Sequence, residues 1–228
     1  LRLDDQGYPH LAYGRDHLYY TWRDASGWHG ETADSAPLVG TKASLALTPG
    51  GAPRISYFDA LNGTLKYAYR DSSGWHAQTL DSAASGSTSL ALDVSGYAHI
   101  SYWDGQHLKY AYQDAGGWHF ELADGDIFTG QSSSLALDGD GNPHVSYWDQ
   151  VNSSLSYAYK DGSGWHTTIL DSASSPGDTS SIALDANGLV HISYHAAYPN
   201  YDLKYAVGDA NGFVVSFVDQ VDGVGAYN

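Results

Sequence analysis

The 228-residue sequence predicts an all-β fold made of five copies of one four-stranded unit. The first observation is an internal repeat that fills the chain. The second is composition: of 26 acidic residues only Glu31 and Glu121 are glutamates, which leaves 24 aspartates. Aspartate disfavours helix interiors and favours turns. With 26 Gly and 19 Tyr, the sequence is typical of strands joined by tight turns.

The repeat is clearest in a short apolar segment. Ser44-Leu45-Ala46-Leu47 returns as Ser89–Leu92, as Ser134–Leu137 and, with Ile, as Ser181–Leu184, and residues 1–4 are a clipped copy. The spacings from Leu1 through Leu45, Leu90 and Leu135 to Ile182 are 44, 45, 45 and 47 residues. Five units of this length fill the sequence, so we expect one domain over residues 1–228.

Each unit contains four runs of strand type. In the third unit, run A is Leu90–Leu92, run B is His99–Trp103, run C is Leu108–Tyr112 and run D starts at Trp118. Four antiparallel strands repeated five times predict a five-bladed β-propeller. The alternative is an open β-solenoid, whose repeats are usually shorter. The predicted blades one to five cover about residues 1–43, 44–88, 89–133, 134–180 and 181–228.

The turns between runs C and D carry a family resemblance. They read Asp71-Ser72-Ser73-Gly74-Trp75, with equivalents at Asp24–Trp28, Asp114–Trp118 and Asp161–Trp165, and with Phe213 in place of Trp at Asp209–Phe213. This pattern resembles the β-propeller repeats of secreted bacterial and archaeal proteins, related to the sialidase-type Asp-box. The Asp-box has its Gly two residues after the Asp, and here the distance is three. The resemblance implies a fold over the whole chain and no particular activity.

Loop lengths distinguish the two edges of the predicted blades. The offset from the last Leu of run A to the first residue of run B is 7 in all five units, and the offset from the end of run C to the Trp or Phe is 6. The B–C offset varies from 5 (Tyr13–Leu18) to 9 (Tyr194–Leu203), and the D–A linkers also vary. Antiparallel pairing places both variable connections at the same edge. Since variable loops on a rigid scaffold commonly bind ligands, we expect the functional surface there.

The B–C loops contain aromatic rings beside carboxylates and amides. The candidate ligand-binding residues are Phe58, Asp59, Asn62, Trp103, Asp104, His107, Trp148, Asp149, Asn152, His195, Tyr198 and Asn200. An aromatic ring can stack on the apolar face of a sugar, and a carboxylate or amide can hydrogen-bond its hydroxyls. The alternative interpretation is structural: the Asp caps its own turn and the ring packs between blades.

The repeated histidines and one acidic turn receive structural interpretations. His10, His99, His144 and His191 open run B, and His29, His76, His119 and His166 follow the run D aromatic residue. We expect buried imidazoles that bond a neighbouring turn. The sequence of residues 138–142, Asp-Gly-Asp-Gly-Asn, resembles the start of a calcium loop but lacks the downstream Glu, so an ordinary hairpin is expected. No cofactor is predicted; a calcium ion is the alternative that the acidity of the chain leaves open.

Several function classes are disfavoured. A formal net charge of −16 argues against a nucleic-acid partner, and no apolar run approaches the length of a membrane span. The absence of Cys excludes disulfides and zinc-thiolate sites. A glycosidase needs a carboxylic acid and an opposing carboxylate, and the only two glutamates lie in run D, the outermost strand. A His195/Tyr198 pair would suit a polysaccharide lyase, but Lys204 is the only nearby cation.

Near-identical blades favour several weak, equivalent sites over one active site. The predicted function is therefore a non-catalytic, multivalent, lectin-like carbohydrate-binding propeller with a glycan or polysaccharide as partner. The second hypothesis is a cell-surface or self-assembling module that binds protein. The third is a polysaccharide lyase or glycosidase. No catalytic or metal residue is assigned, and the expected location is extracellular or at the cell surface.

Overall fold

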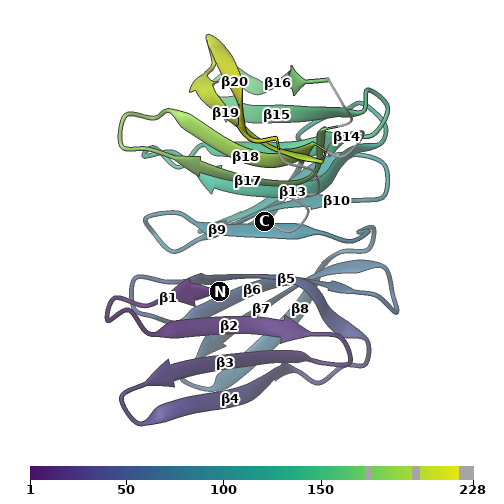
Figure 1. The fold of residues 1–228 in the computed structure, drawn as a ribbon. Coiled ribbons are helices and arrows are strands. Elements are labelled where there is room, and N and C mark those ends of the chain that lie inside the picture. The colour runs from purple at the N-terminus through teal and green to yellow at the C-terminus, as the bar shows by residue number, and fades with distance from the viewer. Residues whose placement is uncertain (173–175, 197–200, 221–228) are drawn as a thin grey trace. The chain divides into compact units, whose positions relative to one another are not determined.

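The protein is described from a computed structural model in which residues 1–172, 176–196 and 201–220 are placed. These residues form twenty strands in five sheets, each of four antiparallel neighbours in the order of the chain (Figure 1). The predicted four strands per unit are confirmed. Two compact units are described separately below: unit 1 is residues 1–102 and 112–119, and unit 2 is residues 103–111 and 120–228.

The strand bounds follow the repeat. Blade one contains β1 (Arg2–Leu3), β2 (Pro9–Gly14), β3 (Leu18–Asp24) and β4 (Gly27–Asp34). Blade two contains β5 (Val39–Leu47), β6 (Pro53–Asp59), β7 (Thr64–Asp71) and β8 (Gly74–Asp81). Blade three contains β9 (Thr88–Leu92), β10 (Ala98–Trp103), β11 (Leu108–Asp114) and β12 (Gly117–Leu122). Blade four contains β13 (Thr129–Leu137), β14 (Pro143–Asp149), β15 (Ser154–Asp161) and β16 (Gly164–Asp171). Blade five contains β17 (Pro176–Leu184), β18 (Val190–Ala196), β19 (Asp202–Asp209) and β20 (Gly212–Asp219).

The innermost strands of blades two, four and five begin five residues before the predicted boundaries at 44, 134 and 181. In blades two and four the extra residues pair only after register shifts, with positive φ at Lys42 (54°) and Ser132 (51°). Such bulges interrupt the side-chain alternation that marks a strand in the sequence. The predicted boundaries therefore coincide with the regular part of each strand.

The turn between the first two strands of a blade is built on one aspartate in four blades and on Thr48 in blade two, where Thr48 Oγ1 accepts from the backbone N–H of Ala52 at 3.0 Å. In blade three, Asp93 Oδ1 accepts hydrogen bonds from the backbone N–H groups of Ser95 (2.9 Å) and Tyr97 (2.8 Å). Gly96 completes the turn with φ of 82°, a conformation that favours glycine. The same backbone hydrogen bonds close the turn at Thr48 as at Asp93. This shared turn geometry, with an Asp or Thr oxygen at its first residue, accounts for the constant offset.

In four of the five sheets a buried tyrosine joins the sheet to a carboxylate at, or just after, the end of the sheet before it. The hydroxyl of Tyr57 donates to Asp34 Oδ2 at 2.6 Å, and Tyr147 donates to Asp124 Oδ2 at the same distance. The other two members of the set are Tyr102 with Asp81 (2.6 Å) and Tyr194 with Asp171 (2.7 Å). Each tyrosine is at most 1% exposed. We call this contact the Tyr–Asp latch; it ties the B strand of one blade to the D–A linker of the preceding one.

A second inter-blade contact joins aromatic rings. Tyr20 of β3 meets Trp75 of β8 edge-on, with ring centroids 5.3 Å apart. The same contact recurs for Tyr67 with Trp118 (5.1 Å), Tyr110 with Trp165 (5.2 Å) and Tyr157 with Phe213 (5.1 Å). Edge-to-face geometry places the positive ring edge on the negative ring face and adds to the apolar burial. The recurring Trp of the C–D turn is therefore an inter-blade packing residue.

Among the described residues, no helix has the length and hydropathy of a membrane-spanning segment.

The Tyr–Asp latch generates a stability prediction. Tyr147→Phe removes the hydroxyl donor and leaves the Asp124 carboxylate, which is 8% exposed, short of one hydrogen bond. We expect the free energy of unfolding to fall by about 1–3 kcal/mol, as for loss of a hydrogen bond to a buried charged group. The measurement is equilibrium denaturation by guanidinium chloride followed by tryptophan fluorescence.

The matched control is Tyr13→Phe. Tyr13 stands at the same strand position in blade one, is 53% exposed and accepts a 3.2 Å hydrogen bond from Thr21. Loss of the Tyr13 hydroxyl should change the free energy of unfolding by less than about 0.5 kcal/mol, as for most surface substitutions. Equal losses in the two variants would contradict the role of the latch.

Candidate functional site

The two glutamates of the chain lie at equivalent inter-blade junctions. Glu31, on β4, accepts two hydrogen bonds from the Arg70 guanidinium of β7: Nε to Oε2 and Nη2 to Oε1, each 2.9 Å. Trp75, on β8, donates its indole N–H to Glu31 Oε2 at 2.7 Å. Glu31 thus accepts hydrogen bonds from a bidentate guanidinium and from an indole N–H, both of the next blade.

The same arrangement is repeated 90 residues later. Glu121 accepts from Lys160 Nζ at 2.6 Å and 2.7 Å through its two oxygens, and from Trp165 Nε1 at 2.8 Å. We call the two groups the Glu31 and Glu121 clusters. Both are reached by solvent: the side chains of Arg70 and Glu31 are 42% and 30% exposed, and those of Lys160 and Glu121 are 29% and 26% exposed.

The other two described junctions lack the glutamate. In the register position of Glu31, opposite the C-strand tyrosine, β8 carries Gln78 and β16 carries Thr168. The Trp118 indole N–H has no hydrogen-bond partner, and Phe213, which has no donor, replaces Trp opposite blade four. The four described junctions therefore alternate between one with a glutamate and one with Gln or Thr in its place.

A cleft opens beside the Glu31 cluster. It has a volume of about 470 Å³, and its lining includes Tyr20 and Trp22 of blade one and Arg70 of blade two. The Trp22 ring stacks on His29 at 5.0 Å and on Tyr20 at 5.4 Å. Such a combination of aromatic rings with a few oriented polar groups is typical of small-ligand clefts.

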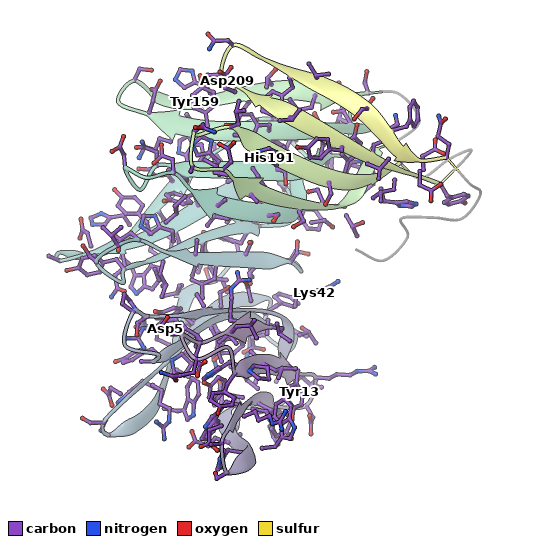
Figure 2. The ribbon with its side chains drawn as sticks, turned by 60° about the vertical axis from the view of Figure 1, so that its left-hand side comes forward. Asp5, Tyr13, Lys42, Tyr159, His191 and Asp209 are labelled. Carbon is purple, nitrogen blue, oxygen red and sulfur yellow. The ribbon has the colours of Figure 1, made fainter. Side chains whose placement is uncertain are left out.

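An equivalent cleft of about 390 Å³ lies between blades four and five. Tyr157 and Tyr159 of β15 line one side, and Asp209 and Phe213 of the next C–D turn line the other. Figure 2 labels Tyr159 and Asp209 at this place. A further cavity of about 520 Å³ is lined by Asp4, Thr48 and Asp93 in the A–B turns of unit 1. Residues of the A–B or C–D turns, at the edge where turn lengths are constant, line all three of these cavities. At the variable edge, the predicted residues Asp149 and Asn152 line a smaller pocket of about 200 Å³.

The structure assigns the carboxylates of the predicted B–C sites to their own turns. Asp59 is 4% exposed, and its Oδ1 accepts from the backbone N–H groups of Leu61 and Asn62, each 3.0 Å. The Asn62 amide donates to Asp59 Oδ2 at 2.9 Å. Asp149 and Asn152 make the same pair at 2.6 Å. Asp59 and Asp149 thus cap their own turns, as the structural interpretation expects. That these residues bind a ligand stays a prediction.

The third loop has the same construction with a histidine. Asp104 Oδ1 accepts from the backbone N–H of Gln106 (2.8 Å) and of His107 (2.7 Å), and the His107 ring lies 3.5 Å from Oδ2. The rings of Phe58, Trp103 and Trp148 are half-buried. The indole N–H groups of Trp103 and Trp148 have no hydrogen-bond partner. In all three loops the carboxylate is therefore already occupied by its own turn. Phe58 with Asp59, and Trp148 with Asp149, are consecutive strand residues, so each ring and its neighbouring carboxylate leave the strand on opposite faces.

In blade five, His195 is 4% exposed and stacks on Tyr201 at 5.8 Å. The predicted residues Tyr198 and Asn200 lie outside the described residues. Lys204, the nearby cation of the lyase hypothesis, is 4% exposed and donates to Asp171 Oδ2 at 2.8 Å.

The structural interpretation of the run B histidines is confirmed. His144 Nδ1 is hydrogen-bonded to the Tyr157 hydroxyl at 2.5 Å, and its Nε2 lies 3.6 Å from Asp138 Oδ2 in the A–B turn. Burial lowers the pKa of His144, and the opposing effect of Asp138 is smaller. In the calcium-like turn, Asp138 Oδ1 accepts from the backbone of Asp140 (2.9 Å) and Asn142 (2.8 Å), as in an ordinary hairpin. In the described part of the chain, no three His, Cys, Asp or Glu residues converge as a metal site.

Sequence reasoning considered Glu31 and Glu121 only as catalytic acids and set them aside. It missed that they meet a cation and an indole of the next blade. One signal was present: Glu31, Arg70 and Trp75 recur as Glu121, Lys160 and Trp165 at a constant offset of 90 residues. That offset spans two blades, so a comparison of single repeats with one another does not reveal the recurring set.

Comparison with known proteins supports the fold. No protein-family model matches the chain, and no curated protein matches it. Among solved structures, a triple arginine-to-alanine variant of AofleA from Arthrobotrys oligospora aligns with 99% of this chain and 75% of its own, at 15% identity and a TM-score of 0.64. The SapL1 lectin in complex with alpha methyl fucoside aligns with 96% of this chain and 81% of its own, at 15% identity and a TM-score of 0.64.

The fold is a five-bladed β-propeller. A variant of the Aleuria aurantia lectin AAL in complex with Fucα1-6GlcNAc also aligns, over 92% of this chain and 77% of its own, at 12% identity and a TM-score of 0.54. At such identities the likeness identifies the propeller fold and carries no residue assignment.

The C–D turns that flank the clefts generate a pH prediction. A hydrogen bond from the Ser73 hydroxyl, then the Ser73 backbone N–H and His76, lower the pKa of Asp71 to about 2. Because the pKa of Asp71 is lower in the folded state than in the unfolded state, ionised Asp71 stabilises the folded protein above roughly pH 4, the ordinary Asp pKa. This stabilisation is lost as the pH falls through about 2, where Asp71 becomes protonated. Ser73→Ala should raise the Asp71 pKa toward its ordinary value, measured by carboxyl carbon NMR titration.

Ser72→Ala, one residue away and exposed, is the matched control and should leave the Asp71 pKa unchanged. Asp114 provides an internal reference, because Gly116 replaces the serine and its lowered pKa depends first on His119. A titration in which Ser73→Ala leaves Asp71 unmoved would contradict the assigned hydroxyl contact.

Proposed function

We propose that the protein is a carbohydrate-binding, lectin-like propeller whose principal sites are the Glu31 cluster, with the cleft beside it, and the Glu121 cluster. The observation that carries this proposal is the Glu31 cluster: a partly exposed carboxylate, a guanidinium and stacked aromatic rings beside a cleft of about 470 Å³. Paired acceptors and donors match the neighbouring hydroxyls of a sugar ring, and the aromatic rings match its apolar face.

The guanidinium and carboxylate are held ready for a ligand. Arg70 uses Nε and Nη2 on Glu31, so its Nη1 group remains as a donor in the cleft. Glu31 has further lone pairs beyond those that Arg70 and Trp75 occupy. Because neither side chain must be ordered on binding, a sugar would meet a pre-organised site. Named structural neighbours are lectins crystallised with fucosides, which supports a deoxyhexose or related glycan as the ligand.

Two clusters in one chain support multivalent binding of a glycan polymer or cell surface, in which weak sites gain avidity. Such a ligand fits the extracellular location and the secreted-repeat resemblance expected from the sequence, both of which remain part of the proposal. The B–C loops, with Trp103 and Trp148, form the second candidate surface. A protein-binding or self-assembling module is the alternative function.

The test is a glycan screen that includes fucosides, followed by calorimetry on any ligand found. We expect more than one site per chain. Arg70→Gln should weaken binding at the first site by about 10–100-fold, because it removes a charged donor pair, and should lower the stoichiometry by one.

The matched control is Arg23→Gln. Arg23 is exposed and occupies the register position of Arg70 in blade one, opposite Trp28. Its replacement should leave binding unchanged. If the double variant Trp103→Ala plus Trp148→Ala lost binding and Arg70→Gln kept it, the site would lie in the B–C loops. No binding to any saccharide would contradict the proposed function and favour a protein partner.

A further inference from the structure

A small polar pocket lies at the variable edge between blades three and four, apart from the Glu121 cluster. Its volume is about 200 Å³, room for roughly six waters at about 30 Å³ each. Its polar lining consists of Asp124, Asp126, Tyr147, Asp149, Asn152 and Ser156, and residues of β16 complete it. All of these residues belong to unit 2.

At two of the equivalent junctions, those of blades two and five, a lysine side chain lies in this place. In blade three, Lys109 lies 3.7 Å from Asp104 Oδ2 of its own B–C loop. Ser156 pairs with Tyr147 in the β14–β15 register, and the corresponding partners are Lys66 for Tyr57 and Lys204 for Tyr194. Lys66 and Ser156 are again 90 residues apart. Blade four therefore carries a hydroxymethyl group where blades two and five carry a butylammonium group.

Lys66 and Lys204 bind the latch aspartates of their junctions, and Asp124 is the equivalent aspartate for blade four. Lys204 Nζ donates to Asp171 Oδ2 at 2.8 Å, and Lys66 Nζ donates to Asp34 Oδ2. Although burial raises the pKa of Asp34, hydrogen bonds from Lys66 and Tyr57 hold it below its ordinary value. The structure thus shows, at two places, that the latch carboxylate accepts an ammonium group beside the tyrosine hydroxyl.

At Asp124 the described contacts come from Tyr147 (2.6 Å) and from the backbone N–H of Asp126 (2.9 Å). None of the described lining residues is Lys or Arg. Burial, followed by the charges of Asp124, Asp149 and Asp126, raises the pKa of the Tyr147 hydroxyl. The pocket therefore combines negative potential with an unfilled volume at the position of the missing lysine.

We propose that this pocket binds the primary ammonium group of a ligand, which replaces the lysine that blades two and five supply from their own chain. The ammonium contacts Asp124 beside the Tyr147 hydroxyl, and the stem lies over Ser156. An amino sugar and a lysine side chain both present this chemistry. The inference does not depend on glycan binding at the Glu31 and Glu121 clusters.

The test exchanges the residues at the equivalent positions 66 and 156. Butylammonium, which reproduces the lysine side chain, is titrated into the purified chain by calorimetry. We expect saturable binding to the wild type and at least a tenfold loss in Ser156→Lys, which fills the pocket with its own ammonium. Lys66→Ser opens the blade-two junction and should add one site. The double exchange keeps the net charge and should restore the wild-type stoichiometry.

Two controls isolate the contribution of the ammonium charge. 1-Butanol has a similar shape without the charge and should not bind measurably. Thermal denaturation of each variant shows that it is folded, and Ser156→Lys should melt higher than the wild type. Equal binding of butanol, unchanged binding to Ser156→Lys, or displacement of the amine by equimolar calcium would each overturn the proposal.

The source of the ammonium is resolved by two further ligand pairs. Glucosamine is compared with N-acetylglucosamine, and Nα-acetyl-lysine amide with its Nε-acetylated form. Preference for glucosamine identifies an amino sugar, and preference for the lysine derivative identifies a protein side chain. Equal binding of the charged and acetylated forms in both pairs would contradict ammonium recognition.

Discussion

The structure depends on one buried hydrogen bond, in which a tyrosine hydroxyl donates to the aspartate at, or just after, the end of the preceding sheet. A four-stranded sheet has two apolar faces and cannot bury both alone. The Tyr–Asp latch fixes how the next sheet meets it: Tyr57, Tyr147 and their equivalents are at most 1% exposed. A buried carboxylate without its donor is costly, so sliding of one sheet over the next is opposed by that penalty. The edge-on aromatic contacts, such as Tyr20 with Trp75, then join the C strand of one blade to the D strand of the next.

The fold was predictable because its information is local and repeated five times. Alternation, Asp–Gly turns and constant offsets predict the strands, and Asp93 and Asp138 show why: each organises its own hairpin. The run B histidines were also interpreted correctly as structural. The expected burial was wrong for the run D histidines: His76 and His119 bond the Asp of their C–D turns, but their side chains are 41% and 43% exposed. The site was less predictable. A carboxylate such as Asp59 beside a ring has the composition of a sugar site, yet sequence does not reveal that its oxygens already cap the turn. The partners of Glu31 come from another blade, and single-repeat comparison does not show that contact.

Differences among equivalent positions carry more functional information than the consensus. The position opposite the latch tyrosine is Lys66, Ser156 or Lys204, and each choice changes whether the latch aspartate has a cation. The position opposite the C-strand tyrosine is Glu31, Gln78 or Thr168. The aromatic residue that contacts this tyrosine is Trp75 beside Glu31, Trp118 beside Gln78 and Phe213 beside Thr168. The scaffold is thus held constant by residues common to the blades, and its chemistry is set by the few that vary in correlated pairs.

The 90-residue offset bears on how such a chain can lengthen or shorten. Glu31 lies on one blade and its Arg70 and Trp75 partners lie on the next. Duplication of a single blade would place a glutamate against a blade selected to face Gln or Thr, or an indole donor against no acceptor. Copying two blades at once preserves every donor with its acceptor. The two clusters therefore repeat with a period of two blades, twice the length of the folding unit.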